Sequence, residues 1–194
     1  MENSAKDPAP PSSGKVKFVV FGVVVAMLVF WAYALSKPTP NLPNSPLVNQ
    51  QAREFSLPDL ASGELRHLRD WRGKYVVLNF WASWCTACRS EVAELEALHR
   101  NLGDSGVSVL GIVVQDEAED ARAFAAEFQQ TFPSLIDTNG TVAVNYGITG
   151  LPETFVFNPE GSITRKFIGP VTREMVLAAL NEAGFGSATT YATP

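Results

Sequence analysis

The chain's only two cysteines, Cys85 and Cys88, lie between two segments with different hydrophobic patterns. Residues 75–80 (YVVLNF) form a run of β-branched and aromatic side chains, which is typical of a strand buried on both faces of a sheet. After the cysteines, apolar residues recur at spacings of three and four, which predicts a helix; they are Val92, Leu95, Leu98 and Leu102. The pattern therefore places both thiols at a junction between a central strand and a helix.

Two thiols separated by two residues at such a junction can close and reopen a small ring by thiol–disulfide exchange. If the helix begins at Cys85 or just after it, the Cys85 sulfur lies against unpaired backbone N–H groups, which stabilise its thiolate. Cys88 follows one helical turn later, in a less exposed position, and would resolve a mixed disulfide formed by Cys85. We expect the pair to be exposed at the edge of the sheet.

Two other uses of the pair are less favoured. A four-coordinate zinc site needs two more ligands, and His67 and His99 are the only histidines. A disulfide that closes so short a loop removes little entropy from the unfolded chain, so a stabilising crosslink explains the pair poorly. We therefore expect no metal, and no cofactor besides the redox-active disulfide Cys85–Cys88 itself.

Glu91 lies three residues after Cys88 and shares a helix face with it. That face continues into apolar residues, so burial can raise the pKa of the carboxyl group and let it exchange a proton with Cys88. An exposed glutamate that only compensates the helix dipole explains the residue equally well. Asn79, on the strand before the cysteines, either points beneath them or makes an ordinary hydrogen bond in the core.

Pro152 follows a glycine-containing turn and precedes a predicted strand at 154–158. A cis X–Pro bond at such a place can bring backbone beside the thiols. Because few X–Pro bonds in folded proteins are cis, the spacing alone leaves both isomers open.

The remaining pattern predicts an α/β domain. We expect a β-hairpin over 54–68, a second buried strand at 107–114, a helix over 116–130, a strand near residue 135, a short helical turn over 141–146, a hairpin between 154–158 and 162–168, and a last helix over 172–183. Elements in this order specify helices on both faces of a mixed sheet.

Residues 18–35 contain no charged side chain, and this apolar run approaches the roughly 20 residues that a helix needs to cross a bilayer. We expect one transmembrane helix here, although Ala32 and Ala34 would also suit the cleavage site of a signal peptide. Lysines are more frequent before this segment than just after it, which predicts a cytoplasmic N-terminus and an extracytoplasmic domain at the cell membrane.

The other segments complete the predicted organisation. We expect residues 1–17 to form a cytoplasmic tail, the proline-rich residues 36–52 an extended spacer, residues 53–183 the folded domain, and residues 184–194 a loose tail. The net charge of −5 and the absence of any block of basic residues argue against nucleic-acid binding.

Three separated motifs resemble one known family. They are DWRGK at 70–74, NFWASWCTACRSE at 79–91 and GLPETF at 150–155. Together with the predicted anchor, they resemble the membrane-anchored thioredoxin-like proteins of the TlpA, ResA and CcmG (DsbE) type over residues 53–183. The resemblance implies a thioredoxin-like fold with an N-terminal β-hairpin extension and a central helix–strand insertion, tethered by one transmembrane helix.

The resemblance also implies roles for individual residues. Cys85 corresponds to the nucleophile and Cys88 to the resolving cysteine. Pro152 corresponds to a cis-proline, and the backbone of Leu151 before it would pair with the substrate. Glu91 matches the active-site glutamate of the family, which favours a role in proton transfer. Further substrate contacts are expected from Trp84, Thr86, Ala87 and Glu153, the last at an acidic position found in CcmG-like members.

Two positions depart from related sequences. Asn79 stands where thioredoxin has a buried aspartate, so Glu91 can replace that group in proton handling. Thr86 and Ala87 lack the proline that is common before the second cysteine, and the residues between the cysteines influence thiolate stability and reduction potential. The direction of electron flow is therefore left open.

Family members of this kind act as reductants in an oxidising compartment. The resemblance implies reduction of a protein disulfide, such as that of apocytochrome c, and regeneration by a membrane electron donor of the DsbD or CcdA type. The same motifs permit another client, such as a copper-delivery protein of a terminal oxidase, or a non-catalytic adaptor that binds clients or copper. A peroxidase is disfavoured, because peroxiredoxins carry Thr three residues before the reactive cysteine, where this chain has Ala82.

Overall fold

The computed structural model describes residues 13–36 and 46–186 of the chain. The chain divides into two units, residues 1–40 and 41–194. Several predictions concern other residues: the predicted cytoplasmic tail up to residue 12, the spacer from 37 to 45 and the loose tail from 187 onward all lie outside the described residues.

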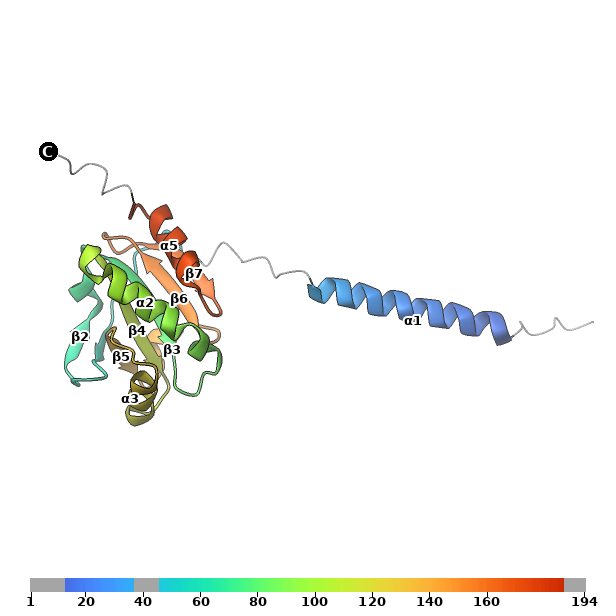
Figure 1. The fold of residues 1–194 in the computed structure, drawn as a ribbon, viewed down its shortest axis with the longest axis horizontal. Helices are drawn as coiled ribbons and strands as arrows, with labels where there is room; N and C mark the ends of the chain where they lie inside the picture. Colours follow the sequence, from blue (N-terminus) through green and yellow to red (C-terminus); the bar gives the residue numbers. More distant parts are fainter. Residues whose placement is uncertain (1–12, 37–45, 187–194) are drawn as a thin grey trace, which may run out of the picture. The chain divides into compact units, whose positions relative to one another are not determined.

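The first unit contains one described helix, α1, over Ser13–Ser36. It covers the segment predicted to span a membrane (Figure 1). In the described part of the chain, no helix combines the length and the apolar character that a membrane span requires. The transmembrane helix expected over 18–35 is thus not shown by the structure and stays a prediction.

The second unit is built on a five-stranded mixed sheet with the strand order β5-β4-β3-β6-β7 (Figure 1). Its strands are β3 (Tyr75–Trp81), β4 (Val107–Val114), β5 (Ser134–Asp137), β6 (Glu153–Phe157) and β7 (Ile163–Ile168). β4 runs parallel to both β3 and β5, whereas β6 is antiparallel to β3 and β7. The prediction that residues 75–80 form a central strand is confirmed.

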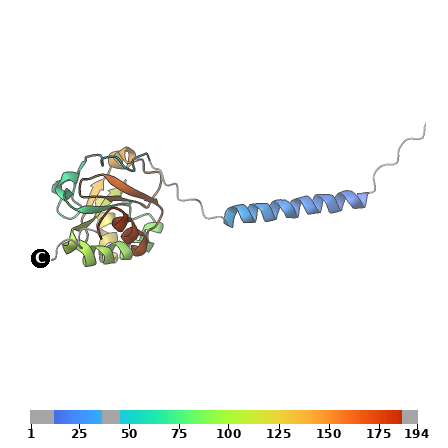
Figure 2. The same ribbon diagram turned by 90° about the horizontal axis from the view of Figure 1, so that it is seen from above.

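Helices cover both faces of this sheet, as the order of the elements predicted. One face packs against α2 (Val92–Leu102), α3 (Ala118–Glu127) and α5 (Arg173–Glu182). The other face packs against α4 (Thr141–Asn145) and the segment before β3; Figure 2 shows α2 and α4 on opposite sides of the sheet. The layers are those of a thioredoxin-like fold.

The alternation of side chains along β3 decides which residues reach the α2 side. Val77 and Trp81 belong to the core on that side, whereas Leu78 and Phe80 belong to the opposite core. Since successive side chains on a strand point to opposite faces, Asn79 points toward α2 together with Val77 and Trp81. A polar side chain is thereby placed in the layer that follows the cysteines.

The predicted hairpin over 54–68 is confirmed as β1 (Ser56–Pro58) paired antiparallel with β2 (Leu65–His67). A 3₁₀ helix, η1 (Leu68–Trp71), then leads toward β3. The helix predicted over 116–130 is shorter, because α3 ends at Glu127 and the chain turns before β5.

The prediction of a spacer up to residue 52 is wrong at its end. Leu47 and Ala52 are buried and belong to the core on the α4 side of the sheet. Asn49 N donates to Ile163 O at 2.7 Å, and Ile163 N donates to Gln50 O at 2.9 Å. The domain therefore begins before residue 53. Leu47 packs into the core, and the backbone of residues 49 and 50 forms hydrogen bonds with Ile163 at the start of β7.

This docking can be tested with Leu47→Ala in the full chain. Removing a buried leucine side chain costs roughly 2–3 kcal/mol of the free energy of unfolding, which urea denaturation measures. Val144→Ala is the control, because Val144 is 77% exposed and its truncation removes little contact. Equal midpoints for the two variants and the wild type would contradict the docking of residues 47–52.

Candidate active site

Cys85 and Cys88 form a disulfide just beyond the end of β3. The two sulfur atoms are 2.05 Å apart and the two Cα atoms 5.4 Å apart. The backbone N–H of Cys88 donates to Cys85 Sγ at 3.1 Å. The predicted contact between the first sulfur and a backbone N–H is thus present, although this N–H is shared with Cys85 O at 3.2 Å. Such a contact stabilises a thiolate once the disulfide is reduced.

Two details of the predicted geometry are wrong. The residues after Cys85 form a 3₁₀ helix, η2 (Ala87–Ser90), and the α-helix begins only at Val92. The two cysteines are also not exposed, since Cys85 is 5% and Cys88 2% exposed. The tight turn folds both sulfur atoms back into the core beneath α2, so the sequence pattern alone overestimates their exposure.

The residues around the disulfide form the accessible part of the site. Trp84 is 61% exposed, and Thr86 and Ala87 are exposed as well. These three predicted substrate contacts therefore lie on the surface around a recessed Cys85. A client must reach the sulfur across them.

A buried carboxylate, which the sequence analysis missed, holds the segment in front of the cysteines. Asp116 Oδ2 accepts from Ser83 N at 2.6 Å, and Asp116 Oδ1 accepts from Ser83 Oγ at 3.0 Å. Next to it, Trp84 Nε1 donates to Gln115 O at 3.3 Å. The position of Asp116 was a usable signal: β3 and β4 are parallel, so residues that directly follow them lie at the same edge of the sheet.

Glu91 is buried next to Cys88, so it is not the exposed glutamate that one of the two interpretations above described. The side chain is 1% exposed. Its Oε1 accepts from Asn79 Nδ2 at 2.7 Å, and its Oε2 accepts from Val171 N at 3.0 Å. Burial raises the pKa of Glu91 to about 7, although both hydrogen bonds oppose that shift. A group with this pKa can both accept and release a proton near neutrality.

Asn79 links this carboxylate to the neighbouring strand. Its Nδ2 donates to Thr154 Oγ1 at 3.0 Å as well as to Glu91, and Asn79 and Thr154 are direct partners in the β3–β6 ladder. Asn79 also lines the same cavity as Cys88. It therefore lies beneath the cysteines and is not a core amide unrelated to them.

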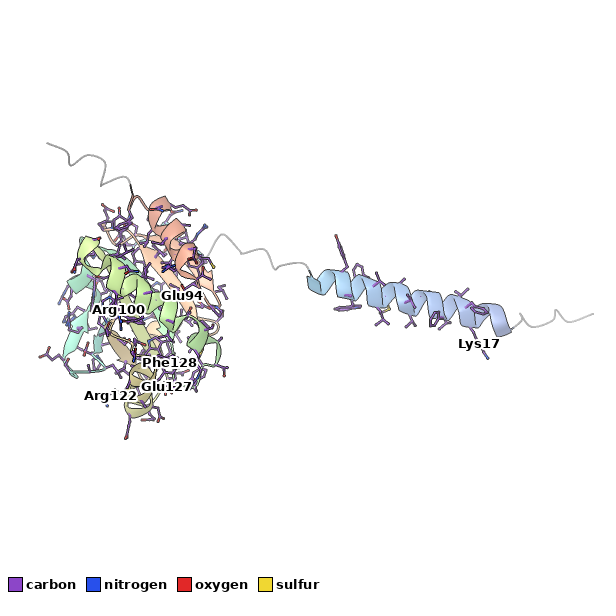
Figure 3. The ribbon with its side chains drawn as sticks, viewed as in Figure 1. Lys17, Glu94, Arg100, Arg122, Glu127 and Phe128 are labelled. Carbon is purple, nitrogen blue, oxygen red and sulfur yellow. A yellow bond between two sulfur atoms is a disulfide. The ribbon has the colours of Figure 1, made fainter. Side chains whose placement is uncertain are left out.

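α3 is tied to the residue that follows Cys88. Arg89 Nη1 pairs with Glu127 Oε1 at 2.9 Å, and its guanidinium carbon lies 5.3 Å from the ring centre of Phe128. Figure 3 shows Glu127 and Phe128 together at the end of α3. This contact helps to hold the end of α3, and the loop after it, against the active-site turn.

The Leu151–Pro152 peptide bond is cis, as the resemblance implied. Pro152 is buried, and Leu151 packs against the core cluster that contains both cysteines. The predicted loop therefore packs on the same core cluster as the disulfide, although the two are far apart in the sequence.

Glu153 does not lie where a substrate contact was expected. Its side chain is fully buried. Its Oε1 accepts from Thr149 N at 2.9 Å and Thr149 Oγ1 at 2.8 Å, and its Oε2 pairs with Lys166 Nζ at 2.7 Å. These partners satisfy the carboxylate inside the domain, so it supports the proline loop from within and does not face a client.

A disulfide that can open and close, with a titratable carboxyl group lining the same small cavity as the second sulfur, has what thiol–disulfide exchange requires. Among the described residues, no group of three or more His, Cys, Asp and Glu side chains gathers to hold a metal ion. The fold and the site together define a thiol–disulfide oxidoreductase of the thioredoxin-like class.

The chain belongs to the AhpC/TSA family, whose model matches residues 48–166. It is 34% identical to the thiol:disulfide interchange protein DsbE of Allochromatium vinosum over 166 residues, which cover 84% of this chain and 90% of that protein. It is 36% identical to the thiol-disulfide oxidoreductase ResA of Geobacillus thermodenitrificans over 127 residues, 66% of this chain and 72% of that protein.

A similar solved structure belongs to the same class of protein. The structure of a secreted thiol-disulfide isomerase from Corynebacterium glutamicum superposes with a TM-score of 0.67 at 26% identity, and the match covers 76% of this chain and 93% of that one. The predicted resemblance to the DsbE and ResA type and the predicted enzymatic activity are thereby confirmed.

The pKa of Glu91 predicts how stability depends on pH. The folded protein keeps this proton up to about pH 7, whereas the unfolded chain loses it near the ordinary value of about 4.5. The free energy of unfolding of the disulfide form should therefore fall as pH rises from about 4.5 to 7, by roughly 3 kcal/mol. Urea denaturation across this range measures the slope.

Glu91→Gln should remove this contribution to the slope, because the amide does not titrate. Glu94→Gln, in the first turn of α2 just after Glu91, is the control and should retain the slope that belongs to Glu91. If Glu91→Gln and the wild type show the same pH dependence, Glu91 does not titrate in the folded protein as described.

Proposed function

We propose that the protein is an extracytoplasmic reductant of protein disulfides in cytochrome c maturation. The observation that carries the direction of electron flow is the buried carboxyl group of Glu91, which lines the same cavity as Cys88. Once ionised, this group disfavours a second negative charge on a nearby sulfur. Since thiolates are stabilised less in such a site, the disulfide is favoured and the reduced protein gives up its electrons readily.

The short helical turn supports the same direction. In the described part of the chain, one backbone N–H contacts Cys85 Sγ, and the α-helix begins only at Val92. The partial positive charge of a helix N-terminus falls off within its first turn. Cys85 thus receives less stabilisation as a thiolate than it would at the start of an α-helix.

The reaction follows from the arrangement of the two cysteines. The Cys85 thiolate attacks one sulfur of the client disulfide, forms a mixed disulfide and releases the other client sulfur as a thiolate. Cys88 then gives up its proton and attacks Cys85, which breaks the mixed disulfide and releases the second client sulfur. The client gains two electrons, and the Cys85–Cys88 disulfide is formed.

The client and the location are part of the proposal. The resemblance to the DsbE and ResA type supports apocytochrome c as the client and a membrane carrier of the DsbD or CcdA type as the electron donor. The uncharged segment 18–35 and the lysines before it support an anchored domain on the outer side of the membrane.

Complementation of a strain that lacks the gene tests this function. The wild-type chain should restore haem-stained c-type cytochromes, whereas Cys85→Ser should not, because the mixed disulfide cannot form. Gln129→Met, at an exposed position outside the site, is the control and should restore them, with all variants present at equal levels.

Two outcomes would contradict the proposal. If c-type cytochromes are normal without the gene while the copper centre of a terminal oxidase is missing, the client is a copper-delivery protein. If Cys85→Ser restores c-type cytochromes fully, the protein acts there without thiol–disulfide exchange.

A further inference from the structure

A small cavity lies directly next to Cys88, on the α2 side of the sheet. Its volume is about 10 Å³, close to the roughly 10–15 Å³ that one water molecule requires. The polar residues that line it are Asn79, Trp81, Glu91 and Gln130, together with Cys88 itself. The cavity thus joins the resolving cysteine to the buried carboxyl group.

Two of these residues have buried polar atoms without a hydrogen-bond partner among the described residues, namely Trp81 Nε1 and Gln130 Oε1. The indole nitrogen can only donate and the amide oxygen can only accept. Leaving such a group unpaired in the interior is unfavourable, because it loses its hydrogen bonds to water without replacement. A water molecule in a cavity of this size can accept a hydrogen bond from the indole nitrogen and donate one to the amide oxygen.

Neighbouring contacts fix both atoms in place. Gln130 Nε2 donates to Ser134 Oγ at 2.8 Å, which leaves the amide oxygen as the unpaired end. A Cβ atom at Gly111 would lie 2.6 Å from Trp81 Nε1 and would collide with Ser134 Oγ. Glycine at this position of β4 therefore keeps the space around the indole nitrogen and the Gln130–Ser134 contact free.

We propose that Trp81 and Gln130 hold one water molecule in this cavity, and that this water carries the proton between Cys88 and Glu91. The water accepts from Trp81 Nε1 and donates to Gln130 Oε1. Its second hydrogen is then available to the carboxylate of Glu91, and its second lone pair to the S–H group of Cys88. All four positions of the water have a partner when the cysteines are reduced.

In the resolving step, every proton and bond is accounted for by this transfer. The Cys88 proton passes to the water while a proton of the water passes to the Glu91 carboxylate, so the water is unchanged and the carboxylate becomes a carboxylic acid. The Cys88 sulfur bonds to Cys85, the bond from Cys85 to the client sulfur breaks, and that sulfur leaves as a thiolate. Since Glu91 has a pKa of about 7, the transfer is reversible near neutrality.

Trp81 and Gln130 are positioning residues in this scheme, because they act on the reacting groups through the water. The inference uses only thiol–disulfide exchange at this pair, which applies to either direction of electron flow and to any client. The identity of the client and the location of the domain can therefore fail their own test without affecting it.

Gln130→Met in the full chain tests the relay, because methionine keeps the length of the side chain and removes the acceptor. The reduced protein is mixed with oxidised glutathione in a stopped-flow instrument, which separates the attack of Cys85 from the resolution by Cys88. Resolution should slow by about ten- to a hundredfold, and the attack of Cys85 should keep its rate, since general acid–base catalysis acts on the Cys88 proton.

Two controls separate the relay from a general loss of packing. Gln129→Met makes the same change at the preceding, exposed residue. Ser134→Ala removes the partner of Gln130 Nε2 but keeps the amide oxygen. Gln129→Met should resolve at close to the wild-type rate. Ser134→Ala loosens the Gln130 amide but keeps its acceptor oxygen, so it should slow resolution less than Gln130→Met does. A wild-type rate in Gln130→Met, an equal slowing of both steps, or a slowing in Ser134→Ala as large as in Gln130→Met would overturn the proposal.

A crystal structure of the wild-type protein gives a second readout that does not require any variant to fold. Density for an ordered water within hydrogen-bonding distance of Trp81 Nε1, Gln130 Oε1 and the Glu91 carboxyl group would support the relay. A cavity without such density at a resolution that shows other buried waters would overturn it.

Discussion

The burial of Glu91 connects the parts of this domain that make up its active site. The carboxyl group is held by Asn79 from the central strand and by the backbone N–H of Val171, which comes just before α5. Residues far apart in the sequence thus converge on one group inside the α2 layer. Burying a carboxyl group disfavours its charged form, so the same packing that closes the core gives the residue a pKa near neutrality.

This arrangement couples the proposed thiol–disulfide exchange at Cys88 to a proton transfer to Glu91. In the proposed mechanism, Cys88 loses a proton before it attacks Cys85, and a carboxyl group with a pKa of about 7 lines the same cavity as Cys88. Asp116 holds the segment in front of Cys85 through Ser83. In the proposed mechanism, clients bind the exposed surface around Cys85, and the buried polar residues next to Cys88 handle protons.

Much of this was predictable from the sequence, because the signals were local. The spacing of the cysteines, the apolar run of β3 and the position of Glu91 three residues after Cys88 each depend on neighbouring residues. The burial of the sulfurs, the docking of Leu47 and the interior position of Glu153 depend on how distant segments pack, so the sequence pattern gave the wrong answer. Asp116 and Gln130 were missed because a polar residue after a strand or helix is usually only a turn residue.

The midpoint potential of the Cys85–Cys88 couple tests the central claim most directly. The account predicts that the full chain, equilibrated with glutathione or dithiothreitol buffers at pH 7, has a potential well below the roughly −120 mV of a strong oxidant. It also predicts that Glu91→Gln raises the potential, because removing a buried negative charge stabilises thiolates. A wild-type potential near that of a strong oxidant, or one unchanged by Glu91→Gln, would contradict the account.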